Sequence, residues 1–192
     1  MQKDTKITTG LRCSGVGACI CARHECVRAQ GLGDLQKGER YVIKFLTALN
    51  MYAYGLYRRY ANMDYIFFSA ILGITLLFLT VSYDIACQWK RNLFKRMQKL
   101  LSELRLAPDS IKMQFGIPVW HASAHEVSCQ MENGLGLQDG VGRTDGEGIE
   151  RTWAEMNTMA TSTKEMGEGA RHDTLDDHFS FHNFEKNIQL GE

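Results

Sequence analysis

The apolar positions between Tyr65 and Tyr83 form a nearly continuous hydrophobic stretch that ends at Asp84. Its second half is rich in β-branched and large apolar side chains, a pattern typical of a buried strand. Gly73 separates this half from a first half that we predict to be helical. The stretch therefore predicts a helix that turns at Gly73 into a core strand, with the carboxyl group of Asp84 at the strand's mouth. Because it contains polar residues and is barely long enough to cross about 30 Å of hydrocarbon, we expect no membrane partner.

A second pattern follows the glycine-rich loop at residues 134–148. Thr144 and Glu147 have the spacing of a capping box, which predicts the start of a helix. At about 100° per residue, Glu150 lies roughly 60° from Trp153, on the edge of the apolar face, and Glu147 lies roughly 120° away. Glu150 can therefore face a cleft beside the core. The apolar residues that recur at helical spacing are Ile149, Trp153, Met156 and Ala160.

The acids Asp84 and Glu150 allow two interpretations. One carboxylate at a strand end and another on a helix edge could share a divalent metal ion. Alternatively, Asp84 ends a strand, and Glu147 and Glu150 cap and solvate a helix. Periodicity alone leaves both open.

Residues 90–106 are amphipathic and predict one helix that Pro108 stops. Its basic residues lie largely off the apolar stripe. They could contact a phosphate backbone, in which case affinity would depend on salt, or they could form a solvated face. The candidate DNA-binding residues are Lys90, Arg91, Lys95, Arg96 and Lys99.

Two segments combine thiols with imidazoles. Residues 13–26 contain four cysteines and His24, which could bind zinc or could belong to a strand with buried thiols. Residues 115–120 predict an edge strand, which leads to His121, His125 and Cys129. If this segment is helical, these three side chains lie along one face, where they could bind zinc or form a hydrogen-bonded packing site.

Composition narrows the class of protein. The 192 residues suffice for one domain with a core. Lysine plus arginine equals aspartate plus glutamate at 22 each, so any argument for nucleic-acid binding must be local. Six cysteines behind a polar N-terminus do not suggest a secreted disulfide scaffold, and we expect a reducing, intracellular compartment. Residues 31–40 predict a polar, turn-rich loop, and residues past 163 predict a solvated polar helix.

Several motifs in one order resemble the KDZ (Kyakuja-Dileera-Zisupton) transposases that are abundant in fungal genomes. The strings are LRCSGVGACICARHE, GLGDLQKGERY, NMDYIFFSA, SYDIACQWKRNL, FGIPVWHASAHEVSCQ, GRTDGEGIERTWAEMN and TKEMGEGARHDTLDDH. The resemblance implies an α/β RNase H-like DDE/D transposase core with helical insertions. It also implies DNA as the partner, namely transposon ends and target, together with a nuclear location; an oligomeric assembly stays open.

The resemblance assigns roles to individual residues. Asp84 resembles the middle catalytic acid, and the DGEGIE segment resembles the one that supplies the glutamate; helix geometry favours Glu150, with Glu147 as the alternative. These acids would hold Mg²⁺ or Mn²⁺ for phosphoryl transfer. Cys21 and His24 resemble a CxxH element that is structural or linked to Zn²⁺.

The sequence departs from the family pattern in two ways. Residues 42–59 are an insertion, either a lineage-specific helix or a retained intron. The family's first aspartate lies in a strand upstream of the Cys21–His24 element, and only twelve residues precede Cys13. We therefore expect residues 1–192 to be a partial catalytic domain, built from segments 13–41, 42–59, 60–106 and 115–192 and inactive alone. The alternative is a non-catalytic, metal-stabilised module that binds nucleic acid or protein.

Overall fold

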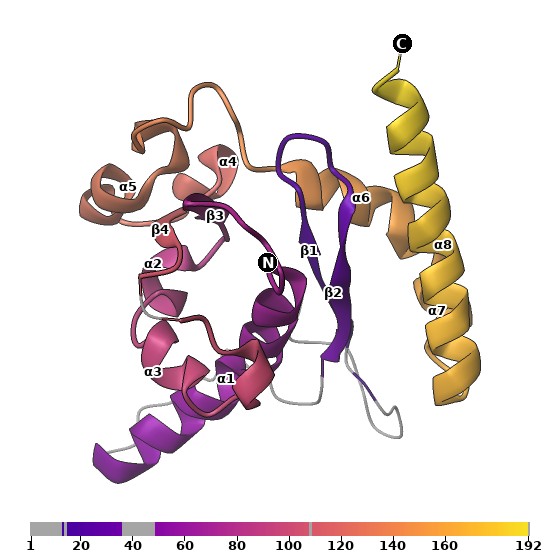
Figure 1. Ribbon diagram of the computed structural model, residues 1–192, viewed down its shortest axis with the longest axis horizontal. Helices are drawn as coiled ribbons and strands as arrows, with labels where there is room; N and C mark the ends of the chain where they lie inside the picture. The colour runs from indigo at the N-terminus through magenta and orange to yellow at the C-terminus, as the bar shows by residue number, and fades with distance from the viewer. Residues whose placement is uncertain (1–12, 14, 36–48, 108, 192) are drawn as a thin grey trace.

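The computed structural model describes residues 13, 15–35, 49–107 and 109–191, with residues 49–59 described by their backbone alone (Figure 1). This part of the chain has a mixed α/β architecture with two small sheets and several helices. The mixed α/β class agrees with the sequence prediction. Among the described helices, none has the length and hydropathy needed to cross a membrane.

The first sheet is an antiparallel hairpin of β1 (Gly15–Ile20) and β2 (Val27–Leu35). Helix α1 (Leu49–Ala70) packs against it. A Cβ atom at Gly17 or Gly33 would lie 2.8 Å from the Ile66 side chain, so these glycines let the helix approach the strands closely. The prediction of a loop at residues 31–40 is wrong for its first half, because β2 continues to Leu35. Of the predicted insertion, residues 42–48 lie outside the described part, and residues 49–59 form the first half of α1.

The second sheet pairs β3 (Phe78–Ser82) with β4 (Lys112–Gly116) in parallel, from Phe78↔Lys112 to Ser82↔Gly116. The helix that turns at Gly73 into a strand is confirmed, because α1 ends at Ala70, Gly73 has φ 76° and β3 follows. The predicted edge strand at 115–120 begins and ends earlier, at 112–116. Parallel pairing puts the C-terminal ends of both strands at one edge, where Asp84 follows β3.

The predicted helix at 90–106 is wrong. The chain forms α2 (Ala86–Trp89), α3 (Leu93–Met97) and a 3₁₀ turn, η1 (Ser102–Leu104). Asn92 interrupts the helix with a left-handed φ of 58°, a conformation that asparagine tolerates better than most residues. The short segments wrap around a core formed with α1, whose buried residues are Tyr60, Phe67, Phe68, Ile71, Trp89, Leu93, Met97 and Leu104.

A buried ion pair joins α1 to these short helices. Arg96 donates from Nε to Asp64 Oδ2 at 2.6 Å and from a terminal nitrogen to Oδ1 at 3.0 Å. The indole of Trp89 donates to the same carboxylate at 2.9 Å. Arg96 also donates to the carbonyl oxygens of Arg91 and Trp89. Arg96 is only 8% exposed, so its assignment as a DNA-binding residue is wrong.

After β4 the chain forms α4 (Val119–Ala122), α5 (Val127–Asn133) and the 3₁₀ turn η2 (Leu135–Leu137). Glu126, which precedes α5, has φ −60° and ψ 149°, so α4 and α5 are separate helices. His121, His125 and Cys129 are therefore not on one continuous helix and do not share a helical face, which the prediction required.

The last segments are α6 (Gly148–Met156), η3 (Asn157–Met159), α7 (Ala160–Thr163) and α8 (Glu168–Gln189). Helix α8 lies along the hairpin beside β2 (Figure 1). Asn183 accepts a hydrogen bond from Val27 N at 2.7 Å and donates to Val27 O at 3.0 Å. Arg171 and His172 both contact Asp34. The predicted polar helix thus has one solvated face and one face, with Leu175, Phe179 and His182, that is buried.

We expect Asp64→Asn to lower the free energy of unfolding by about 3–5 kcal/mol, because it leaves the buried Arg96 guanidinium without its counter-charge. Urea denaturation followed by tryptophan fluorescence measures the effect. The matched control is Lys95→Met, on the exposed side of α3, for which we expect a change within about 0.5 kcal/mol. Equal losses in the two variants would contradict the role assigned to the pair.

Acid should loosen the contact between α8 and the hairpin. Burial raises the pKa of Asp34, but His172 and Arg171 outweigh it and hold the pKa below its ordinary value. Below about pH 4 the unfolded chain takes up this proton first, so the stabilisation is lost as pH falls through the folded-state pKa.

The variant Asp34→Asn tests this dependence. It should cost about 1–3 kcal/mol at neutral pH, because Arg171 is buried and loses its carboxylate partner. It should also flatten the acid side of the stability profile, measured by urea denaturation at several pH values. Asp176→Asn, at an exposed position of α8, is the control and should keep the profile of the native chain.

Candidate functional site

Asp84, His121 and Glu150 meet at the edge where the parallel strands end. Asp84 follows β3, His121 lies in α4 after β4, and Glu150 lies in the first turn of α6. One ligand atom from each lies within 4.8 Å of the others, and His121 Nε2 is 3.5 Å from Asp84 Oδ2. The side chain of Asp84 is 39% exposed and Glu150 is exposed, so the group is open to solvent. The structure thus brings together the two acids that the sequence paired.

Glu147 has different contacts from Glu150. Its carboxylate accepts a hydrogen bond from Trp120 N at 2.9 Å and lies 3.0 Å from His121 Nδ1. A proton held on Nδ1 by this carboxylate leaves Nε2, on the Asp84 side, with its lone pair. Carboxylate–histidine pairs of this kind orient metal ligands in many proteins. Glu147 is thus held against α4 by Trp120 N and His121 Nδ1.

The start of α6 differs from the predicted capping box. The helix begins at Gly148 rather than after Thr144, whose hydroxyl donates to Val141 O. Asp145 Oδ1 instead accepts from Glu147 N at 2.9 Å. The capping-box prediction fails because the Glu147 side chain is held by α4 and does not return to the backbone of its own helix.

The glycine-rich loop brings α6 to the strand end through close packing. Gly146 has φ 77°, and a Cβ atom there would lie 2.6 Å from both Leu135 Cδ2 and Ser82 Oγ. Val119 N donates to Asp145 O at 2.9 Å, which ties the loop to the start of α4. Glycine is therefore required at 146 by conformation and by space.

Arg151 connects α6 to the turn of the hairpin. It donates to Glu25 Oε1 at 2.5 Å and to Asp145 Oδ2 at 3.0 Å. The hydrogen bond from Arg151, assisted by the Glu147 backbone, holds the pKa of Asp145 below its usual value. Burial raises the pKa of Glu25, but hydrogen bonds from Lys186 and Arg151 outweigh it and lower the pKa. Both carboxylates are therefore ionised partners of the arginine.

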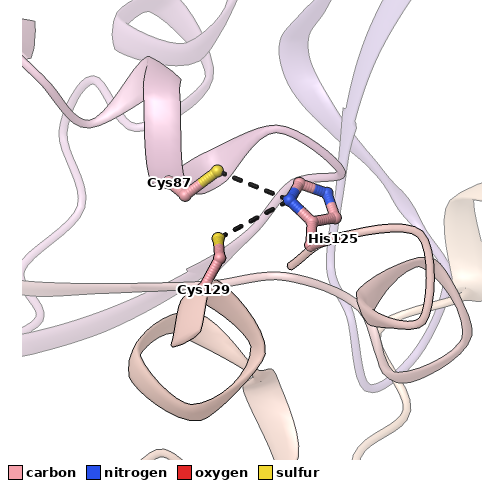
Figure 2. A group of neighbouring side chains, drawn as sticks. All are labelled: Cys87, His125 and Cys129. Carbon is pink, nitrogen blue, oxygen red and sulfur yellow. Dashed lines mark hydrogen bonds between the residues drawn. The ribbon is translucent and has the colours of Figure 1, made fainter. Parts of the chain in front are cut away.

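A second group consists of Cys87, His125 and Cys129 (Figure 2). The Sγ atoms of Cys87 and Cys129 lie 3.7 Å and 3.6 Å from His125 Nδ1. Burial and the neighbouring Cys129 thiol raise the pKa of Cys87. Sequence reasoning selected His125 and Cys129 but missed Cys87, which lies 42 positions before Cys129. Its position three residues after Asp84 was the one available signal. His121, which was grouped with these residues, belongs to the acidic group instead.

Cys21 and His24 lie in the turn of the hairpin, with Cys21 Sγ 3.5 Å from His24 Nδ1. Within the described part of the chain, these two belong to no group of three metal-ligating side chains. Cys19 packs against the core cluster around α1, and burial raises the pKa of its thiol to about 11. The packing interpretation of this segment thus applies at least to Cys19.

The candidate DNA-binding residues have different environments. Arg91, Lys95 and Lys99 are exposed, whereas Lys90 donates to Asn133 Oδ1 at 2.6 Å and Arg96 is buried. Trp120, which sequence reasoning did not select, is 73% exposed beside His121, with ring centroids 5.0 Å apart. An exposed indole next to side chains that could bind a metal ion is an available stacking surface.

Comparison with known proteins gives one match. A family model described as Kyakuja-Dileera-Zisupton transposase matches residues 1–53 and 42–183. The two matched segments overlap at residues 42–53, within the predicted insertion. No curated protein and no solved structure matches the chain.

Proposed function

Since the chain belongs to the Kyakuja-Dileera-Zisupton transposase family, we propose that Asp84, His121 and Glu150 form the divalent-metal part of a centre that cleaves and joins DNA strands. The observation that carries this proposal is the convergence of their ligand atoms within 4.8 Å at the strand ends. Two hard carboxylate oxygens favour Mg²⁺ or Mn²⁺, and an imidazole among them favours Mn²⁺ more. These residues would hold one divalent ion, which would supply charge stabilisation to one of the two oxygens, attacking or leaving, in an in-line displacement at phosphorus.

In this centre we assign each residue one role. Asp84 and Glu150 are the carboxylate ligands, and Glu150 rather than Glu147 is the family's glutamate. His121 is a third ligand, and Glu147 holds its ring through Nδ1. The support for separating the two glutamates is that Glu147 is 14% exposed and already accepts two hydrogen bonds, whereas Glu150 is exposed.

The fold that we propose is a partial RNase H-like core. The parallel β3–β4 pair, with an acid at the end of β3 and a glutamate helix beside it, supports this assignment. The described strands form two separate sheets, and no strand bearing a further aspartate joins them. We propose that the described residues hold only part of the catalytic centre, to which a further aspartate on a joining strand would add a ligand.

DNA is the partner proposed for this edge of the molecule, and the nucleus is the compartment. The exposed indole of Trp120 at this edge can stack on a base. The exposed Arg91 and Lys95, just before and in α3, can neutralise phosphates. A structural Zn²⁺ is the second cofactor that we propose, because cysteine and histidine are its preferred ligands.

A non-catalytic role is the second candidate. The described acidic group contains two carboxylates and one imidazole, which is fewer oxygen ligands than a two-metal centre uses. A module that keeps the fold and binds one metal ion and DNA without cleaving it would satisfy this geometry.

Metal binding tests the proposed centre directly. We expect isothermal titration of Mn²⁺ to give one site, whose affinity falls at least about tenfold in Asp84→Asn and in Glu150→Gln because each removes an oxygen ligand. Glu147→Gln should weaken binding about tenfold by loosening His121. Asp176→Asn is the matched control and should bind as the native chain does. Unchanged Mn²⁺ affinity in Asp84→Asn would refute the assignment.

Strand cleavage separates the two candidate functions. Any Mn²⁺-dependent cleavage of oligonucleotides should disappear in Asp84→Asn and Glu150→Gln while DNA affinity is kept. Cleavage retained by Asp84→Asn would contradict the catalytic role. Metal and DNA binding without cleavage would favour the binding module.

DNA affinity tests the proposed surface. Trp120→Ala should weaken binding of single-stranded DNA by about 1–3 kcal/mol through lost stacking, with little change in salt dependence. The double variant Arg91→Ala and Lys95→Ala should reduce the slope of log affinity against log salt by about 1.4, which is two phosphate contacts on a single strand. Fluorescence anisotropy at several salt concentrations measures both. Lys164→Ala, on the far segment after α7, is the control; equal effects at Lys164 would contradict a local surface.

A further inference from the structure

Two sulfur atoms converge on one nitrogen in the group of Cys87, His125 and Cys129 (Figure 2). An imidazole Nδ1 has either one proton or one lone pair in the ring plane, so it can make one well-directed hydrogen bond. Here it lies 3.7 Å from Cys87 Sγ and 3.6 Å from Cys129 Sγ. A single hydrogen bond accounts for one of these contacts, and a shared central ion accounts for both.

The distances match the edges of a metal tetrahedron. Zinc lies about 2.3 Å from thiolate sulfur and about 2.0 Å from imidazole nitrogen, which at about 109° gives a sulfur–nitrogen separation of about 3.5 Å, close to the two distances found here. All three ligand atoms lie within 4.8 Å of one another, so one ion can reach them. Two soft thiolates with one imidazole favour Zn²⁺ over Mg²⁺.

The surroundings partly bury the group and contact its ligand residues. Cys87 is 8% exposed and belongs to a buried cluster with Ala86 and Ile117, onto which Cys129 packs. Asn133 donates to Cys129 Sγ at 3.6 Å and to Cys129 O at 3.1 Å, and Gln130 donates to His125 O at 2.7 Å. Donors to a ligand sulfur and to the ligand's backbone fix the side-chain direction before metal arrives.

We propose that Cys87, His125 and Cys129 bind one Zn²⁺ ion through two thiolates and the Nδ1 of the imidazole, with solvent in the fourth position, and that this ion clips α2 to the start of α5. Each thiol that becomes a ligand releases its proton to solvent. The site is distinct from the Asp84, His121 and Glu150 group, which it does not share a residue with.

The proposed zinc ion would also affect the acidic group of Asp84, His121 and Glu150, an inference that rests on the proposed function. Cys87 follows Asp84 by three residues and His125 follows His121 by four, so the ion would fix both segments that carry those ligands. Loss of zinc should let the two segments separate. Mn²⁺ affinity at Asp84, His121 and Glu150 should then fall about tenfold, as when the support of a metal ligand is removed.

Metal content tests the zinc site. The native chain, purified from zinc-containing medium, should hold one equivalent of Zn²⁺ by elemental analysis. Cys87→Ser and Cys129→Ser should lose it, whereas Cys13→Ser, a matched cysteine outside the group, should keep it. Zinc absent from the native chain, or one equivalent kept by the double variant Cys87→Ser and Cys129→Ser, would overturn the proposal.

Cobalt substitution avoids dependence on variants that do not fold. Replacement of zinc by Co²⁺ in the native chain should give sulfur-to-cobalt charge transfer and the visible bands of tetrahedral cobalt. The charge-transfer intensity should fall by half in a folded single-cysteine variant. A spectrum without thiolate charge transfer would overturn the site.

Mn²⁺ titration of the zinc-free native chain tests whether zinc supports the acidic group, separately from whether the acidic group binds metal. A tenfold weaker Mn²⁺ affinity than in the zinc-loaded chain supports the clip, and equal affinities overturn it. If Mn²⁺ does not bind in either form while zinc is stoichiometric, the acidic centre fails and the zinc site stands.

Discussion

The buried pair of Asp64 and Arg96 determines how the two halves of the described core meet. Its carboxylate comes from α1 and its guanidinium from α3, 32 positions later, and the indole of Trp89 completes the set of donors. The Arg96 guanidinium also stacks over the Tyr60 ring, 4.9 Å from the centroid. Because an unpaired charge in this interior is costly, the corner between β3 and α3 has little freedom to shift. That corner carries Asp84 and Cys87, one ligand from each metal-capable group.

Both groups have the same construction. Each takes one side chain from the segment after β3, and the segment after β4 supplies one to the acidic group and two to the thiol group. Parallel pairing brings these segments to one edge. The acidic group adds Glu150 from α6, which reaches the edge because Gly146 allows close packing against Leu135 and Ser82. The chemistry of each group follows from its ligands: oxygen and imidazole in one, sulfur and imidazole in the other.

The sequence predicted features that depend on local pattern. The strand before Asp84, the turn at Gly73 and the approach of Glu150 to Asp84 all follow from periodicity, resemblance and strand-end chemistry. The sequence analysis failed where the environment of a side chain depends on a residue far away in the sequence. Arg96 is one basic residue among several until Asp64 takes it into the core, and Glu147 matches a capping box until α4 holds its side chain. The sequence does not show that Cys87 has a thiol neighbour, because Cys129 reaches it only through the folding of α5. Gly33 lies in a stretch predicted as a loop, yet the structure needs glycine there because Ile66 packs onto strand β2.

The side-chain amide of Asn183 binds both the N–H and the C=O of Val27, on the strand that ends the hairpin sheet. An amide used in this way imitates the backbone of a neighbouring strand for one residue. Exposed strand edges recruit other chains into intermolecular sheets, and proteins protect them with helices or interrupting side chains. Helix α8 therefore covers the edge of β2 at Val27, where another chain could otherwise pair with it. A chain without α8 would be prone to aggregate through the hairpin.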